Sequence, residues 1–237
     1  GACVYPFDVK REGLAQLASW LLQEEITIFS GVVSLFRHFV ATLDGTEKFP
    51  HLRLIKLIGE AVHRQDVDLY RKYFSDDCIL INSYGPNEAG HVAHYFIDKE
   101  TNFISNSVPV GYTVAGKDIL LLDGEGREAD RGTVAEIVVR SRYLSPGYWR
   151  RTDLTEAKFR RVPIDGPERL YFTGDLGVRD ADGCLTVTGR EDFQVKIRGN
   201  RVEISEIEGA LLDLESVKEA VVVTRENASA DRQLVAY

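Results

Sequence analysis

The sequence predicts an α/β fold that continues into an α+β region, and three observations support this. The first part alternates apolar strand-like runs with amphipathic helical runs, at the spacing of βαβ units, which predicts a helix-covered, mostly parallel sheet. Next come short apolar runs separated by Gly, Asp and Pro, typical of an antiparallel, barrel-like subdomain. The last part reads strand, helix, strand, as at the start of a small α+β subdomain. We expect these three parts to span 1–106, 107–190 and 191–237.

In the first part, Leu14, Leu17 and Leu21 recur at helical spacing with polar residues opposite them. The opening GACVYPF looks like the middle of a strand. After it we expect helices and strands in alternation: a helix at 13–25, a strand at 26–29, a helix at 33–43, a strand at 52–60, a helix ending near Tyr73 and a strand at 76–85.

The second part carries turn sequences of the type that close hairpins, DGEG and DADG. We expect its strands within 108–126, 132–141 and 183–190. For the third part we expect a hairpin strand at 193–199, a helix at 203–214, a strand at 217–224 and a further strand beginning at 232.

Composition narrows the class of protein. The chain has 237 residues, 44% of them hydrophobic and 28% charged, which is ordinary for a globular protein with a sizeable core. A net charge of −8 argues against nucleic acid or an anionic membrane as the main partner. The sequence has no run of 18 apolar residues and no secretory signal pattern. Three widely spaced cysteines indicate reduced thiols, so we expect a cytoplasmic protein.

Two predicted strands end in polar groups that could face a ligand. In an open parallel sheet, ligands bind at the carboxyl ends of the strands. Gly59 and Glu60 follow one strand, and the stretch NSYGPNE, 82–88, follows another. Tyr84 could stack on a flat heterocycle, Asn82 could recognise an exocyclic amine, and Glu88 could hold Mg²⁺. Taken alone, the stretch favours an ordinary Gly–Pro turn over a ligand site.

A second polar pair lies in the stretch LYFTGDLGVRDADGCLTVTGRED. Asp175 follows a glycine in what we expect to be a turn, where its carboxylate could accept hydrogen bonds from a ribose diol. Arg190 lies 15 residues later and could reach the same sugar or a phosphate. The alternative is a hairpin with solvated charges.

Taken together, these stretches resemble the adenylate-forming enzymes, most closely the adenylation domains of nonribosomal peptide synthetases. The matching blocks occur in the family's order and cover nearly the whole chain: LIGEAV, INSYGPNE, YLSPGYWRRTDLTEAKF, LYFTGDLGVRDADGCL and GREDFQVKIRGNRVEISEIE. The resemblance implies ATP-dependent activation of a small carboxylic acid, an amino acid or a related acid, as an acyl-adenylate. The acyl group would then pass to a phosphopantetheine thiol on a carrier protein domain, with ATP and Mg²⁺ as cofactors.

The resemblance also implies residue roles. Tyr84 would stack on adenine, Asn82 would contact its amino group, Asp175 would bind both ribose hydroxyls and Glu88 would hold Mg²⁺. The implied residues are Gly59, Glu60, Asn82, Tyr84, Gly85, Asp175 and Arg190 for the nucleotide; Glu88, Asn87 and Arg190 for catalysis; Lys56, Ile58, Ser83, His91 and Val92 for the acid pocket; Asp192 as hinge; and Lys196 and Gly199 for the loop presented during thioester formation.

The chain departs from the family pattern in places. Asn87 stands where the family usually has Thr, and Ile58 where it often has a second glycine. The phosphate-binding loop would lie upstream of residue 1, and the late C-terminal lysine beyond Tyr237. We therefore expect the chain to be incomplete at both ends, and to adenylate little or nothing by itself. The absence of Met fits a fragment, and modified methionines are the other explanation.

Other functions stay open at this point. An acyl- or aryl-CoA ligase or a luciferase-like oxidase would share most of these blocks. A truncated, inactive domain that only binds nucleotide would also fit. Lys56 and His91 could face an acidic or polar substrate group, although a lysine stem can equally carry its charge away from the pocket. His91 and His94 lack a further Cys or His at ligand spacing, which argues against zinc.

Overall fold

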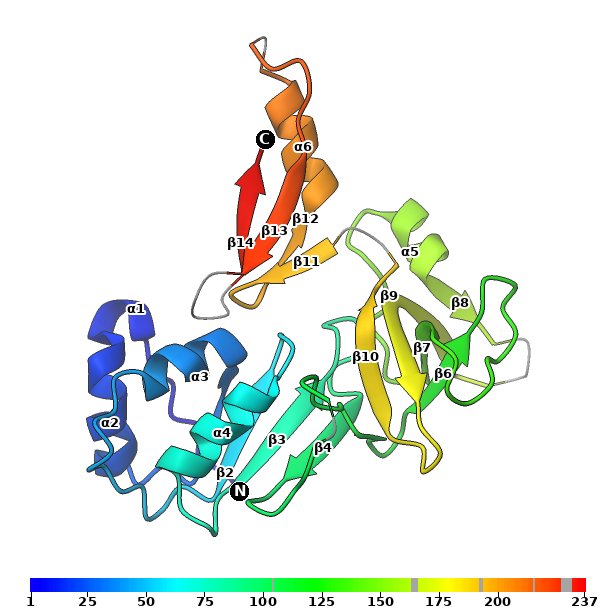
Figure 1. Ribbon diagram of the computed structural model, residues 1–237. Coiled ribbons are helices and arrows are strands. Elements are labelled where there is room, and N and C mark those ends of the chain that lie inside the picture. Colours follow the sequence, from blue (N-terminus) through cyan, green and yellow to red (C-terminus); the bar gives the residue numbers. More distant parts are fainter. Residues whose placement is uncertain (104, 163–165, 192–193, 215, 227–231) are drawn as a thin grey trace. The chain divides into compact units, whose positions relative to one another are not determined.

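The computed structural model describes residues 1–103, 105–162, 166–191, 194–214, 216–226 and 232–237 (Figure 1). The chain divides into two compact units, each described by itself. Unit 1 comprises Gly1–Asn82 and Phe96–Val108, and unit 2 comprises Ser83–Tyr95 and Pro109–Tyr237. Among the described residues, no helix has both the length and the apolar character needed to cross a membrane.

Unit 1 is the α/β part that the sequence predicts. Its elements are α1 (Val9–Glu12), a 3₁₀ turn (Leu14–Gln16), α2 (Leu17–Gln23), β1 (Ile28–Val32), α3 (Val33–Val40), β2 (Leu54–Ile58) and α4 (Arg64–Tyr73). The described residues before α1 form no strand, so the expectation of a strand at GACVYPF is wrong. β1 and β2 pair in parallel, with Ile28 opposite Leu54.

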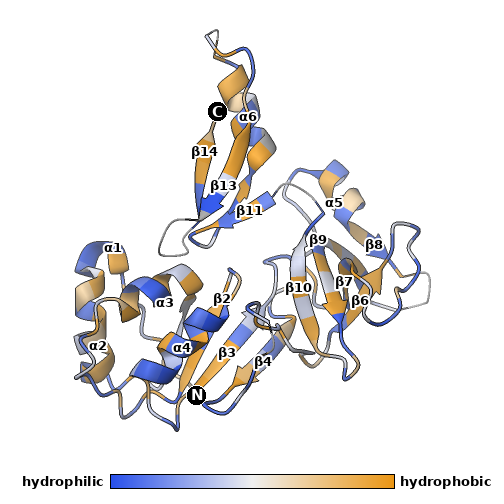
Figure 2. Cartoon of the chain, viewed as in Figure 1, coloured by the Kyte–Doolittle hydropathy of each residue, from blue (hydrophilic) through white to orange (hydrophobic). Residues whose placement is uncertain are grey.

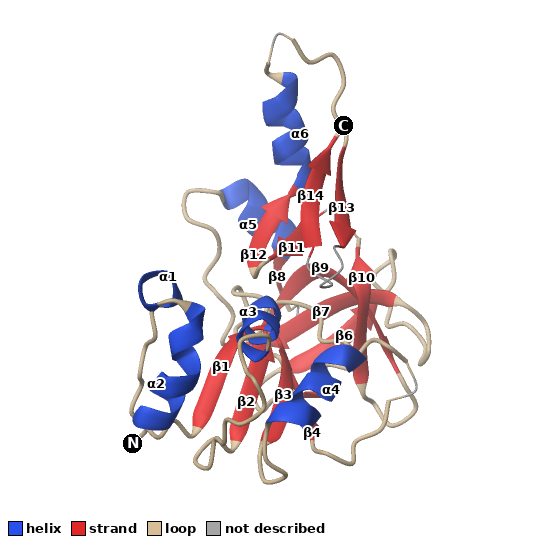
Figure 3. Ribbon diagram, turned by 60° about the vertical axis from the view of Figure 1, so that its left-hand side comes forward, coloured by secondary structure: helices blue, strands red, loops and turns tan. Residues whose placement is uncertain are grey.

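The first sheet has the strand order β1-β2-β3-β4-β5, of which Figure 3 shows β1 to β4. β3 (Ile79–Tyr84) and β4 (Ala93–Ile97) each begin in one unit and end in the other, and β5 (Tyr112–Thr113) pairs antiparallel with β4. In β2 the exposure alternates, with Ile55 and Leu57 buried. This places Lys56 and Ile58 on the opposite face of the strand.

The helices of unit 1 are fixed by a buried ion pair. The guanidinium of Arg37 in α3 donates to both carboxylate oxygens of Asp66 in α4, at 2.7 and 2.9 Å. Asp66 is fully buried and also accepts from the backbone N–H of His63, the residue that caps α4. The three donors offset the desolvation of this carboxylate and hold α3 against α4.

Unit 2 contains the antiparallel part. Its second sheet is built from β6 (Asp118–Leu122), β7 (Ala135–Ser141), β8 (Phe159–Arg161), β9 (Arg169–Arg179) and β10 (Leu185–Arg190), with α5 (Thr152–Lys158) preceding β8. The order is β10-β9-β7-β6, and β8 pairs with β9. Figure 2 shows apolar residues along β7 and β9, whose buried members include Ile137, Val139 and Tyr171.

The expected fold class is confirmed, with one refinement. In the described residues, the antiparallel strands form an open sheet and close no barrel. DGEG is a turn closed by a hydrogen bond from Gly126 to Asp123, and DADG connects β9 to β10. Both turn predictions are confirmed.

β9 is irregular around Gly174. Glu136 of β7 lies opposite Leu176 of β9, and Val138 lies opposite Phe172. Two steps along β7 thus match four steps along β9, so β9 carries two extra residues there. Gly174, within this bulge, has a φ of +73°, which glycine adopts without strain. A bulge bends the strand and re-aims its side chains. Asp175 therefore lies inside a long strand, and the expectation that it lies in a turn is wrong.

The last part of unit 2 contains β11 (Gln194–Ile197), β12 (Asn200–Glu203), α6 (Ile204–Leu212), β13 (Val222–Glu226) and β14 (Arg232–Ala236). β11 and β12 form a hairpin with a two-residue loop, Arg198 and Gly199, whose φ values are +50° and +76°. Two positive φ values in succession are the type I′ pattern that matches strand twist. On one face of this hairpin lie Gln194 and Arg201.

The Arg37–Asp66 pair predicts a large effect of a single substitution. Arg37→Met removes the charge and leaves a fully buried carboxylate without its bidentate partner. We expect a loss of about 3–5 kcal/mol in unfolding free energy, measured by denaturant unfolding. The matched control is Arg127→Met, whose pairs with Asp123 and Glu125 are exposed. The control should lose no more than about 1 kcal/mol. Equal losses in the two variants would contradict the assigned role.

Candidate active site

The loop from Tyr84 to Val92 explains the sequence YGPNEAGHV. It is closed by a hydrogen bond of 2.8 Å from the N–H of Val92 to the carbonyl of Tyr84. A Cβ at Gly85 would overlap the carbonyl oxygen of Gly90, so the loop can close only with glycine at this position. The closed loop places Glu88 in a buried position and leaves Asn87 exposed.

The carboxylate of Asp175 binds two other predicted residues, Tyr84 and Arg190. The hydroxyl of Tyr84, at the end of β3, donates to Oδ2 of Asp175 at 2.6 Å. Arg190 lies directly opposite Asp175 across the β9–β10 ladder and donates to Oδ1 at 2.5 Å. The Asp175 residue is only 5% exposed. Burial first, and then the nearby Asp175 carboxylate, raise the pKa of Tyr84 well above its ordinary value, so its hydroxyl remains a donor.

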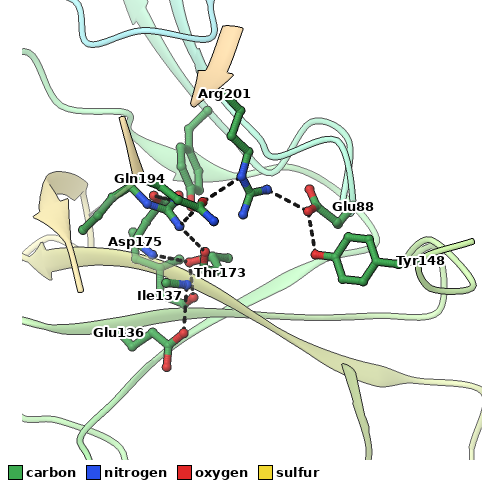
Figure 4. A network of polar contacts seen from close by, with 11 residues as sticks. Glu88, Glu136, Ile137, Tyr148, Thr173, Asp175, Gln194 and Arg201 are labelled. Atoms are coloured by element: carbon green, nitrogen blue, oxygen red, sulfur yellow. Dashed lines mark hydrogen bonds and ion pairs between the residues drawn. The ribbon is translucent and has the colours of Figure 1, made fainter. Parts of the chain in front are cut away.

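The bulge that presents Asp175 has its own polar groups satisfied (Figure 4). Glu136 accepts from the N–H of Gly174 at 2.9 Å. The hydroxyl of Thr173 donates to the carbonyl of Ile137 at 2.6 Å and accepts from the N–H of Asp175 at 3.0 Å. Because buried backbone groups need partners, Thr173 and Glu136 stabilise the irregular backbone. The sequence analysis did not identify these two residues.

Glu88 is a second buried carboxylate, held by two donors. Tyr148 donates its hydroxyl to Oε1 at 2.7 Å, and Arg201 donates NH1 to the same oxygen at 2.8 Å (Figure 4). Burial disfavours the ionised form, but the hydrogen bond from Tyr148 and the charge of Arg201 outweigh it. The pKa of Glu88 is therefore lowered. Glu88 is ionised at neutral pH in spite of being 8% exposed.

A shared acceptor links the two carboxylates. Oε1 of Gln194 accepts from Arg190 and from Arg201, both at 2.7 Å. A continuous chain of contacts thus runs from Asp175 through Arg190, Gln194 and Arg201 to Glu88 (Figure 4). The sequence analysis missed Tyr148, Gln194 and Arg201. All three lie in sequence blocks that resemble the family, which is the only feature of the sequence that points to them.

Unit 1 carries the predicted residues Lys56, Ile58, Gly59, Glu60 and Asn82. β2 ends at Ile58, and Gly59 has a φ of +91°. Glu60 accepts from the backbone N–H of Ser34 at 2.6 Å, in the first turn of α3, which is a favourable place for a carboxylate. Asn82 is buried and donates to the carbonyl of Val108 at 3.3 Å. Burial lowers the pKa of Lys56.

The remaining predicted residues lie in unit 2. Ser83 and His91 approach each other, with Oγ 3.5 Å from Nδ1. Val92 is fully buried in the apolar cluster of unit 2 and Lys196 lies in β11. Gly199 lies in the hairpin loop. The expected hinge, Asp192, falls outside the described residues.

The donor set around Glu88 fits Mg²⁺ bound together with a nucleotide. Mg²⁺ is usually held by one or two carboxylates together with substrate phosphates and water. Glu88 supplies one ionised carboxylate, and the described residues contain no cluster of three His, Cys, Asp or Glu side chains that would form an all-protein site. In the described residues the hydroxyl of Tyr171 is buried without a hydrogen-bond partner. Burial first, and then Glu88 nearby, raise the pKa of Tyr171, so its hydroxyl stays protonated and can donate.

The fold and site agree with three comparisons. The family model for AMP-binding enzymes matches residues 1–149. Gramicidin S synthase 2 of Brevibacillus brevis is 31% identical over 99% of this chain, and tyrocidine synthase 3 of Brevibacillus parabrevis is 34% identical over 97%. This chain spans only 5% and 4% of the lengths of those two synthases.

Solved structures share the same fold. An NRPS protein containing adenylation and PCP domains, bound to a vinylsulfonamide inhibitor, superposes with a TM-score of 0.82 at 27% identity. The match covers 98% of this chain and 39% of that one. These comparisons define a class, the adenylate-forming enzymes. The chain belongs to the family of AMP-binding enzymes, and its relatives include the adenylation domains of nonribosomal peptide synthetases.

The contacts of Glu88 predict a change in acid stability. The lowered pKa means that Glu88 stabilises the fold above the pKa of an unfolded Glu, roughly 4.3, and that this contribution is lost as the pH falls through the lower folded value. Tyr148→Phe removes one hydrogen-bond donor to Glu88. The desolvation of this carboxylate is then offset less well, so the folded pKa of Glu88 rises. We expect the variant to lose about 1.5–3 kcal/mol at neutral pH. This difference from the native protein should shrink as the pH falls below the unfolded pKa of roughly 4.3, because Glu88 becomes protonated in both proteins.

The measurement is the unfolding free energy as a function of pH, for the native protein and the variant. Tyr143→Phe is the control, because that exposed tyrosine contacts Arg142 at the surface. Its pH profile should match that of the native protein. A Tyr148→Phe profile that lies below the native one by the same amount at every pH would contradict the coupling to Glu88.

Proposed function

We propose that the protein activates a small carboxylic acid with ATP and transfers the acyl group to a phosphopantetheine thiol of a carrier protein domain. In the first step a carboxylate oxygen attacks the α-phosphorus, and the bond to pyrophosphate breaks. In the second step the thiol sulfur attacks the acyl carbonyl, AMP leaves with the bonding electrons, and the thiol proton is released. An amino acid or a related acid is the expected substrate.

One observation supports this proposal: the buried carboxylate of Asp175, in β9, accepts hydrogen bonds from Tyr84 of β3 and from Arg190 of β10. Each oxygen of Asp175 accepts one hydrogen bond from the protein. A carboxylate oxygen can accept two, so each retains capacity for one more donor. A ribose diol offers two donors with the matching spacing. We infer that Asp175 binds the 2′- and 3′-hydroxyls of ATP, with Arg190 preserving its charge and orientation.

The other roles are those that the family resemblance implies. Tyr84, Asn82, Gly59, Glu60 and Gly85 would contact the nucleotide, and Glu88 would hold Mg²⁺. Bound Mg²⁺ neutralises phosphate charge that develops during the transfer. Asn87 is exposed beside Glu88 and could donate its amide to the α-phosphate. Lys196 and Gly199 would serve the thioester step, and Asp192 would be the hinge.

Substrate and partner rest on supporting comparisons. A solved four-domain nonribosomal peptide synthetase, 30% identical to this chain with a TM-score of 0.65, is bound to AMP and glycine. Lys56, Ile58, Ser83, His91 and Val92 are our proposed pocket for the acid. The presence of PCP domains in matching proteins supports a carrier protein as the acceptor.

The ribose role predicts an effect that depends on the nucleotide used. Asp175→Asn keeps the shape but removes the charge, and should weaken binding of MgATP by roughly 10- to 100-fold, since hydrogen bonds to charged groups contribute about 1.5–3 kcal/mol. With 2′,3′-dideoxy-ATP the variant and the native protein should bind almost equally. Calorimetric titration of the full-length protein measures both.

The same titrations include their own control for misfolding. A general loss of structure would weaken both nucleotides, whereas a lost ribose contact weakens only the one with hydroxyls. Asp118→Asn, an exposed carboxylate in β6, should change neither affinity. Equal weakening of ATP and dideoxy-ATP by Asp175→Asn would rule out the ribose role.

Activity is tested by acid-dependent exchange of labelled pyrophosphate into ATP, with a panel of amino acids and other carboxylic acids. We expect at least one acid to support exchange in the full-length protein. Glu88→Gln should lower the rate by at least about tenfold, because a metal ligand is lost, and added Mg²⁺ should restore part of it. Acylation of a carrier protein only when it bears phosphopantetheine would support the second step. Exchange that is independent of every acid would contradict the proposal.

A further inference from the structure

Arg201 binds the carboxylate of Glu88, which the proposed function assigns to Mg²⁺. Its guanidinium donates NH1 to Oε1 of Glu88 at 2.8 Å, and its Nε donates to Gln194 at 2.7 Å (Figure 4). The two partners differ in exposure: the Glu88 side chain is 9% exposed and that of Arg201 is 37%. The anion is therefore fixed inside the unit, whereas the cation reaches it from the hairpin β11–β12.

We propose that Arg201 is an exchangeable counter-ion of Glu88, which competes with Mg²⁺ for this carboxylate. The inference rests on the proposed function, because it takes Glu88 to be the ligand of a metal bound with ATP. It adds that the hairpin β11–β12 and the metal are alternative partners of one buried charge. Arg201 is a positioning residue in this scheme, since it contacts neither ATP nor the acid.

The competition follows from electrostatics. A buried carboxylate without a cation is strongly unfavourable, so Glu88 requires one partner at all times. Mg²⁺ bound to the carboxylate would lie within a few ångströms of the guanidinium, and two cations so close in a poorly solvated place repel each other strongly. Either Arg201 or Mg²⁺ alone would balance the charge of Glu88, whereas both together would repel each other.

The contacts of Arg201 allow it to leave. Its side chain is more than a third exposed, so water can solvate the released guanidinium. Gln194, its other partner, also accepts from Arg190 and keeps that bond. Arg190 itself stays on Asp175 and on the carbonyl of Thr173, so the proposed ribose site is unchanged. Release of Arg201 therefore breaks its hydrogen bonds to Glu88 and Gln194 and leaves the contact of Arg190 with Asp175 in place.

Two ligands that disfavour each other at one site are coupled reciprocally. Binding of MgATP would release the hairpin from Glu88, and docking of the hairpin would weaken the affinity for MgATP. Metal-free ATP has no such conflict with Arg201. The quantity that isolates the competition is the ratio of the dissociation constant of ATP without metal to that of MgATP.

The test is this ratio in the full-length protein, measured by calorimetric titration with ATP in EDTA and with ATP in excess Mg²⁺. Arg201→Met removes the charge and keeps an apolar stem. We expect the ratio to rise by at least about fivefold, the lower end of typical coupling between sites. Arg201→Gln, which has a different side chain, should raise it as well.

The matched control is Arg198→Met, which removes one positive charge from an exposed position in the loop of the same hairpin. Its ratio should equal that of the native protein. An unchanged ratio in both Arg201 variants, or an equal rise in Arg198→Met, would overturn the inference while leaving the proposed function intact. A native protein that binds neither form of ATP would overturn the proposed function, and the inference with it.

Discussion

The candidate site depends on one constraint: the carboxylate of Asp175 is buried, and its charge must be balanced within the fold. An isolated ionised carboxylate in a protein interior is highly unfavourable. Arg190 balances it from the neighbouring strand and Tyr84 from the end of β3, although Tyr84 lies 91 residues away in sequence. The bulge at Gly174 aims the carboxylate at both donors. The closed loop after Tyr84 and the irregularity in β9 thus both adjoin residues of this buried charge.

Glu88 extends this requirement to a second charge. The same loop carries Tyr84 toward Asp175 and, four residues later, Glu88 toward Tyr148 and Arg201. Gln194 ties the two charges together, because its single oxygen accepts from both arginines. The two carboxylates thus belong to one network of polar contacts, in which Arg201 binds Glu88 while Arg190 binds Asp175.

The sequence predicts most elements but only part of the site. Periodicity identified the helices with Leu17 and Leu21 buried, because burial patterns are local. Asp175 was expected in a turn, since Gly–Asp is a turn-like pair and the register that creates a bulge depends on a partner strand. The sequence predicts that Asp175 and Arg190 act at the same sugar, and the ladder of β9 and β10 places them opposite each other. Arg201 was missed because the residue it binds lies 113 positions earlier, and no local pattern encodes such a distant contact.

The two ion pairs of the network differ in a way that separates their roles. In the pair of Asp175 with Arg190 the side chains are 8% and 16% exposed, and both residues sit in one strand ladder. On our proposal this carboxylate therefore keeps Arg190 and accepts additional hydrogen bonds, as a neutral diol supplies. In the pair of Glu88 with Arg201 the cation is 37% exposed and comes from a separate hairpin. On our proposal that carboxylate exchanges its cation, as a metal-binding group requires. The fixed charge would then bind a neutral ligand and the exchangeable charge a cationic one.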